Sequence, residues 1–138
     1  MGAFARRHDG RVQLVSDAAH DRVPQYLNAF DVLCAPSRAT PHWQEQFGRI
    51  LIEGMACGVP VIAADTGEIP HVVGDAGLLV SGESPGAWAR AIEVSLEDDA
   101  RRTELSARGL ARVRERFAWS VVARQHLEFF DSLVAGTA

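Results

Sequence analysis

Short apolar runs alternate with helical patterns in the first half of the chain. Helices are expected over residues 21–30 and 48–57, the second ended by Gly58, and residues 66–76 leave room for one helical turn. Four apolar runs predict strands over 11–15, 31–36, 60–65 and 77–80. Strands that are apolar throughout and separated by helices are typical of a parallel sheet covered on both faces. The pattern therefore predicts an α/β fold.

The second half of the chain is predicted to be helical. Ser84 and Pro85 form a helix start signal, and Asp98 can cap the helix that follows. A last helix is expected over residues 119–134. Apolar residues at helical spacing are predicted to be buried: Trp88, Ile92 and Leu96 on the first helix, Leu105, Leu110, Val113 and Phe117 on the second, and Trp119, Val122, Phe130 and Leu133 on the third.

Composition and charge narrow the classes of function. At 138 residues the chain can form one hydrophobic core, and 47% apolar with 23% charged residues is ordinary for a soluble globular protein. The net charge of −4, with arginines interleaved with acids over 101–116, argues against a nucleic acid partner. The five histidines show no metal-ligand spacing. No run approaches the ~20 apolar residues of a membrane span, so a cytoplasmic protein is expected.

The stretch "EQFGRILIE" places Glu53 within an apolar helical run. An ion pair with Arg49, four residues earlier, would stabilise the helix by only ~0.2–0.5 kcal/mol. The expected helix is apolar nearly all round, which predicts burial, and a carboxylate on a buried helix needs hydrogen-bond partners. A ligand with paired hydroxyls, such as a ribose, could supply them at the open end of a parallel sheet.

Glu45 precedes the same helix, whose first backbone amides, over residues 47–49, are unpaired and carry positive potential. Such a helix start suits a phosphate or diphosphate. Eight residues of helix span ~12 Å, about the length of a sugar diphosphate. A glycosidase-like acid/base pair is the alternative, but it requires carboxylates ~5–9.5 Å apart and leaves the helix start without a purpose.

A longer segment carries a family resemblance. The sequence "PSRATPHWQEQFGRILIEGMACGVPVIAADTGEIPHVVGDAGLLV" is similar to the donor-binding segment of family 4 glycosyltransferases, whose pattern runs P-S, E-x-F-G, E-A-M-A-x-G-x-P-V, G-G-x-P-E and G-x-L-V. The match covers about residues 11–134. The resemblance implies the GT-B architecture of two Rossmann-like domains. It also implies sugar transfer from a nucleotide-sugar donor with retention at the anomeric carbon, without a bound metal or a separate cofactor.

The resemblance assigns roles to five matching positions. Glu45 would contact hydroxyls of the donor sugar and steady positive charge that develops on its ring. Phe47, Gly48 and Arg49 would offer backbone amides to the sugar and diphosphate. Glu53 would accept hydrogen bonds from the ribose hydroxyls.

Three positions around these residues depart from the family pattern. The alanine after the second glutamate is Gly54, and the glutamate after the proline is His71, for which a structural role is favoured. Gly67 matches the first glycine of the G-G turn, whereas Glu68 replaces the second. Gly67 and Glu68 are expected to contact the donor, which leaves the choice of donor sugar open.

The resemblance also implies neighbours that the 138 residues do not contain. Residues 1–138 are expected to be a single partial domain, an incomplete Rossmann-like sheet of about four strands with C-terminal helices. An N-terminal acceptor domain and the first two strands of the donor domain would lie elsewhere. The strand at 11–15 is then expected to pair directly with 31–36, with an open edge on 31–36 as the alternative.

Consequences for activity and partners follow from that partial domain. The isolated chain is expected to be inactive and prone to self-association, and the intact enzyme either cytoplasmic or peripheral to a membrane. Two further functions stay open: a non-catalytic nucleotide-sugar binding module, and a nucleotide-sugar epimerase of the same architecture.

Overall fold

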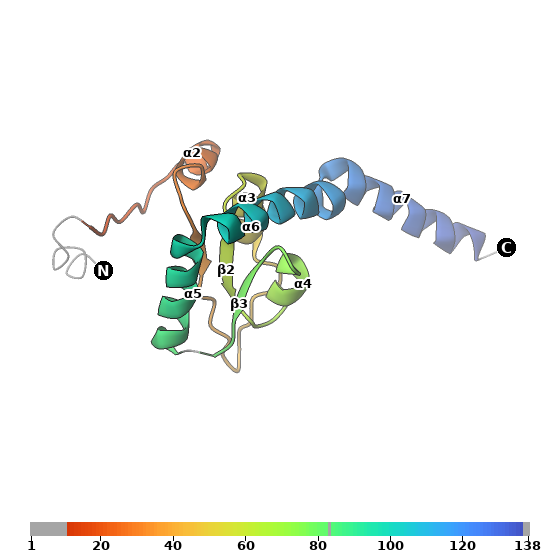
Figure 1. The fold of residues 1–138 in the computed structure, drawn as a ribbon. Coiled ribbons are helices and arrows are strands. Elements are labelled where there is room, and N and C mark those ends of the chain that lie inside the picture. The colour runs from red at the N-terminus through yellow and green to blue at the C-terminus, as the bar shows by residue number, and fades with distance from the viewer. Residues whose placement is uncertain (1–10, 83, 137–138) are drawn as a thin grey trace.

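The chain forms a parallel sheet with helices packed against it, seen in a computed structural model that describes residues 11–82 and 84–136 (Figure 1). Three strands lie in the order β1 (Leu33–Ala35), β2 (Val61–Ala64) and β3 (Gly77–Val80). Both pairings are parallel, with Leu33 opposite Val61 and Val61 opposite Gly77. The predicted α/β fold and the three predicted strands from residue 31 onward are confirmed.

The central strand carries the core. All four residues of β2 are buried, as its continuous apolar run requires, since both of its faces are covered. In β1 only Leu33 is fully buried, whereas Cys34 is exposed. Among the described residues β1 pairs only with β2, so its outer edge is open.

Short helices connect the strands. A 3-10 turn, η1 (His20–Arg22), leads into α2 (Val23–Leu27), and α4 (Ile69–Val73) connects β2 to β3. Between β1 and β2 runs α3 (Arg49–Ala56), which packs against both strands. It ends as predicted at Gly58, whose amide donates to Met55 O at 3.0 Å while Val59 N donates to Gly54 O at 3.0 Å.

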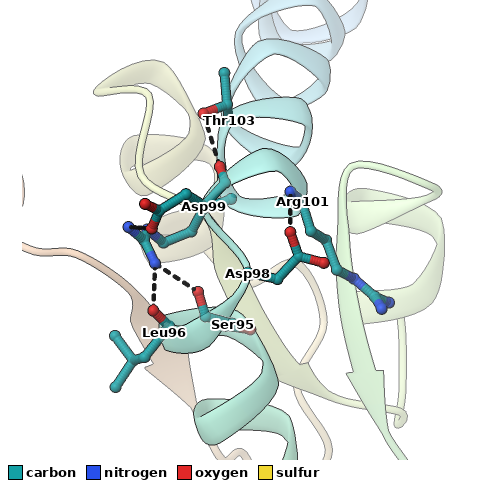
Figure 2. A network of polar contacts seen from close by, with 7 residues as sticks. Ser95, Leu96, Asp98, Asp99, Arg101 and Thr103 are labelled. Carbon is teal, nitrogen blue, oxygen red and sulfur yellow. Dashed lines mark hydrogen bonds and ion pairs between the residues drawn. The ribbon is translucent and has the colours of Figure 1, made fainter.

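Two helices of the second half meet at a polar corner (Figure 2). The chain turns at Asp98 between α5 (Pro85–Glu97) and α6 (Asp99–Arg112), and the Asp98 carboxylate accepts a hydrogen bond from Arg101 N at 2.8 Å. The predicted helix cap is confirmed. Arg102 donates to the carbonyls of Ser95 (3.2 Å) and Leu96 (2.6 Å), so these two carbonyls at the end of α5 have hydrogen-bond partners.

The predicted strand at residues 11–15 is wrong. All five residues are exposed and lie outside any strand, with Leu14 at 56% and Val15 at 43% of full exposure. The apolar alternation was real, but a strand also needs a neighbour with which to exchange backbone hydrogen bonds. The preferred pairing of this segment with 31–36 is therefore wrong, and the alternative of an open β1 edge holds for the described residues.

The burial predicted for the last helix is also wrong. A π-helical segment, η2 (Val113–Phe117), leads into α7 (Trp119–Ala135), which extends away from the sheet in Figure 1. Trp119 is 87% exposed, Phe130 56% and Leu133 53%, whereas Val122 is half-buried. Helical spacing correctly predicted an apolar stripe, but no described element covers most of it. None of the described helices is both long and apolar enough to cross a membrane.

We expect the apolar stripe of α7 to drive self-association of the isolated chain, because association removes exposed apolar surface from water. Light scattering after size exclusion should show species larger than a monomer. Replacing Leu127 (64% exposed) and Phe130 together by glutamine should restore the monomer. A monodisperse wild-type monomer contradicts this prediction, and association that survives the double replacement points instead to the open β1 edge.

Candidate functional site

The carboxylate of Glu45, in the approach loop before α3, is hydrogen-bonded to backbone amides at the start of this helix. Oε1 of Glu45 accepts hydrogen bonds from Gly48 N at 3.1 Å and Phe47 N at 3.4 Å. Gly48 occupies the position just before the helix in a left-handed conformation (φ 70°), which glycine adopts without strain. Negative charge here is favoured by the helix dipole. Two amides that the sequence predicted to be unpaired are thus occupied by Glu45.

A second loop packs directly on the first. Glu68 N donates to the carbonyl oxygen of Glu45 at 3.3 Å, and Glu68 caps the start of α4. Between them, Gly67 has φ 58°, and a Cβ built on it would lie 2.2 Å from the carbonyl oxygen of Glu45 and 3.0 Å from Cγ of Gln44. The two loops can approach this closely only because residue 67 has no side chain.

The two loops together line a cavity of about 650 Å³. This volume is in the range of small-molecule sites. Three residues predicted for the donor site, Glu45, Gly67 and Glu68, line it. Two acidic residues are therefore brought to one cavity next to the positive end of a helix. Such a surface can accept hydrogen bonds from hydroxyls on one side and oppose an anion on the other.

Phe47 does not line this cavity, and its side chain packs against Phe117. Its ring meets Phe117 edge to face, with centroids 6.0 Å apart and planes at 81°. Phe47, Glu68 and Phe117 also line a smaller adjoining hollow of about 270 Å³. The contact fixes the approach loop against the junction between α6 and α7. Arg49, at the first position of α3, is exposed.

Glu53 occupies a different hollow. It is half-buried and faces α2, where it lines a space of about 230 Å³ with His20 and Leu27. Among the described residues no ion pair joins Glu53 to Arg49. The expected burial of α3 on all sides is wrong, because Ile50 is 40% exposed. The two glutamates therefore face separate hollows.

His71 contacts Glu68 and lines the smaller hollow beside Phe47. Its Nδ1 lies 3.3 Å from the carboxylate of Glu68, one turn earlier on α4, and both side chains are largely exposed. Its carbonyl oxygen accepts a hydrogen bond from Arg112, whose Nε also donates to Val72 O at 2.7 Å. Arg112 thereby ties α6 to the end of α4 and holds the loop that carries Glu68.

Residues 37–46 are mostly polar in sequence, yet they contain a well-formed turn. Thr40 N donates to Trp43 O at 2.8 Å, and Trp43 N donates to Thr40 O at 3.3 Å. Trp43 and His42 line the 650 Å³ cavity. A tryptophan in an otherwise polar loop was the available signal. In the described part of the chain, no group of three or more His, Cys, Asp or Glu residues is placed to hold a metal ion.

Comparison with known proteins identifies the class to which this fold and site belong. The chain is a member of the glycosyl transferases group 1 family, which residues 3–98 match. The D-inositol 3-phosphate glycosyltransferase of Salinispora tropica is 35% identical over 127 residues, 91% of this chain and 25% of that protein. An O-antigen chain mannosyltransferase B of Escherichia coli is 38% identical over 93 residues, 67% of this chain and 24% of that protein. The chain spans about a quarter of these relatives.

Solved structures show the same fold over nearly the whole chain. The sucrose-phosphate synthase of Thermosynechococcus elongatus is 32% identical, with a TM-score of 0.79, over 98% of this chain and 34% of that one. Anabaena HepE in complex with UDP and glucose is 27% identical, with a TM-score of 0.81, over 95% of this chain and 35% of that one. The α/β fold of this chain is thus that of part of a glycosyltransferase.

Proposed function

We propose that the protein transfers a sugar from a nucleotide-sugar donor to an acceptor with retention of anomeric configuration, as a family 4 enzyme of GT-B architecture. In this proposal the chain supplies most of the C-terminal, donor-binding domain. The single observation that carries the proposal is the cavity at the start of α3, where Glu45, Gly67 and Glu68 meet beside the positive end of the helix. Support also comes from HepE, a structural neighbour crystallised with UDP and glucose.

The donor would lie along α3. Its sugar would occupy the 650 Å³ cavity and its diphosphate would face the amides of Phe47, Gly48 and Arg49. Since Glu45 holds two of these amides, binding of the diphosphate would exchange one anion for another. The released carboxylate of Glu45 would then turn to the sugar, where it would stabilise positive charge that develops on the ring. The donor acts as a substrate, and no separate cofactor is invoked.

The nucleoside would extend to the hollow that contains Glu53. A carboxylate that accepts hydrogen bonds from the two ribose hydroxyls would account for an acid on a largely apolar helix. The acceptor is assigned to a second domain, as the two-domain architecture of the proposal requires. Because proximity of donor and acceptor supplies much of the acceleration, we propose that the 138 residues alone bind donor but do not transfer sugar.

Replacing Glu53 by glutamine tests the nucleoside end of the site. Loss of a charged hydrogen-bond acceptor should weaken nucleoside diphosphate binding by ~1.5–3 kcal/mol, about 10- to 150-fold. Calorimetry of the chain with UDP and GDP measures this. The effect should disappear with the 2′,3′-dideoxy analogue of the nucleotide that binds, which has no ribose hydroxyls to donate.

The matched control is Glu93→Gln, which changes an exposed carboxylate on α5 and should leave binding unchanged. Equal losses of affinity for the nucleotide and its dideoxy analogue would remove Glu53 from the ribose site. Failure of every nucleotide and nucleotide-sugar in a panel of UDP, GDP, UDP-glucose and GDP-mannose to bind the chain would contradict the proposed function itself.

A further inference from the structure

Trp43 is one of the residues of the cavity to which the proposed function gives no role. Trp43 is 53% exposed, although it is a large apolar side chain, and it lines the cavity that contains Glu45 and Glu68. Tryptophan side chains are usually largely buried, and an exposed indole does not contribute that stabilisation to the fold. Because Trp43 lines the same cavity as these two acidic residues, the surface of the cavity is apolar at one point and hydrogen-bonding at others.

The backbone around Trp43 is fixed independently of its side chain. The turn of residues 40–43 is closed by two backbone hydrogen bonds between Thr40 and Trp43, of 2.8 and 3.3 Å. His42 N lies 3.4 Å from the hydroxyl oxygen of Thr40, to which it donates. The turn therefore presents the indole at the cavity on a defined backbone, and removal of the ring leaves these bonds in place.

The combination of groups matches one chemical class of ligand. A pyranose ring has hydroxyl groups around its edge and C–H groups on its faces. Carboxylates accept hydrogen bonds from the hydroxyls, and the electron-rich face of an aromatic ring receives the C–H groups. A free nucleoside diphosphate has no sugar beyond its second phosphate, so it would leave this aromatic ring without a partner. An aromatic side chain in the sugar part of the site would therefore distinguish a nucleotide-sugar from its free nucleotide.

We propose that Trp43 is a specificity-determining residue whose indole stacks on the face of the donor sugar while Glu45 and Glu68 bind its hydroxyls. This inference rests on the proposed function, since it assigns the sugar of the donor to the cavity. It assigns to the sugar site a residue from the loop before the E-x-F-G sequence. Trp43 would then contact the sugar of the donor and not its nucleotide.

The test compares each donor with its own free nucleotide in the isolated chain. Affinities for UDP-glucose and UDP, and for GDP-mannose and GDP, are measured by calorimetry for wild type, Trp43→Ala and Trp43→Phe. Loss of the buried apolar contact should weaken the nucleotide-sugar about tenfold in the alanine variant. Affinity for the free nucleotide should stay within a factor of two, and phenylalanine should restore most of the loss.

Trp119→Phe is the matched control, because this tryptophan is 87% exposed at the start of α7 and lines none of the cavities described above. It should leave all four affinities unchanged. The inference is overturned, while the proposed function stands, if Trp43→Ala lowers the affinities for the nucleotide-sugar and the free nucleotide equally. The same holds if it lowers neither affinity. If no donor or nucleotide binds the wild-type chain, the proposed function is overturned and the inference with it.

Discussion

Glutamine at position 45 will lower the rate of sugar transfer by the intact enzyme about 10²- to 10³-fold, the effect of removing one preorganised electrostatic contact from a transition state. The same replacement should not weaken binding of the free nucleoside diphosphate. Wild-type Glu45 accepts hydrogen bonds from the amides of Phe47 and Gly48, so in the proposed complex its carboxylate would compete with the diphosphate for the start of α3. A neutral side chain competes less, and affinity for the nucleotide should be retained or increased.

The side-chain carbonyl of glutamine can still accept a hydrogen bond from Gly48 N, so the start of α3 should remain formed. Steady-state kinetics of the intact enzyme gives the rate, calorimetry gives the affinity, and thermal melting checks the fold. Glu128→Gln, an exposed carboxylate on α7, is the control. A rate within threefold of wild type, or a parallel loss of rate and nucleotide affinity, would show that Glu45 serves only as a cap or a binding contact.

Alanine at position 67 should separate the two loops that form the cavity. The added Cβ would lie 2.2 Å from the carbonyl oxygen of Glu45, and a backbone atom cannot rotate away as a flexible side chain can. The left-handed conformation at φ 58° adds a penalty of ~1–2 kcal/mol. We expect the free energy of unfolding to fall by ~2–4 kcal/mol in all. Donor affinity should fall at least tenfold, since the contact between Glu68 N and Glu45 O is lost.

Gly82→Ala provides a control with the same backbone strain and no overlap. Gly82 has φ 76°, and a Cβ built there has no atom within 4 Å. Chemical denaturation should show a loss of ~1–2 kcal/mol for this variant, with donor affinity unchanged. If the two alanine variants lose equal stability and both bind donor normally, close packing of the two loops is not what forms the cavity.

The sequence predicted those parts of the molecule that local pattern determines. The strand at 60–65 was correct because a continuous apolar run suits a strand buried on both faces, and β2 is buried throughout. The cap by Asp98 and the stop at Gly58 were correct because both are set within a few residues of the chain. The grouping of Glu45, Gly67 and Glu68 followed from the family resemblance, and the structure places all three at one cavity.

What the sequence could not predict depends on partners distant in the chain. Residues 11–15 have the alternation of a strand, yet pairing is decided by a neighbour that local pattern does not specify. The apolar stripe on α7 was predicted correctly, but its exposure was not. The spacing of apolar residues shows which face of a helix is apolar and does not show whether another element packs on that face. The occupation of two helix-start amides by Glu45 was missed for a third reason. A flexible carboxylate can fold back on its own helix, and residue type alone does not reveal this.

Binding of the donor diphosphate at the start of α3 is tested most directly by backbone amide resonances of the ¹⁵N-labelled chain during titration with UDP and GDP. We expect the largest saturable shifts at Phe47, Gly48 and Arg49, with smaller shifts around Glu53. The Phe47 and Gly48 amides should change most in character, because they exchange the carboxylate of Glu45 for phosphate oxygens. Saturable shifts centred elsewhere, with the amides of residues 47–49 unmoved, would contradict this expectation.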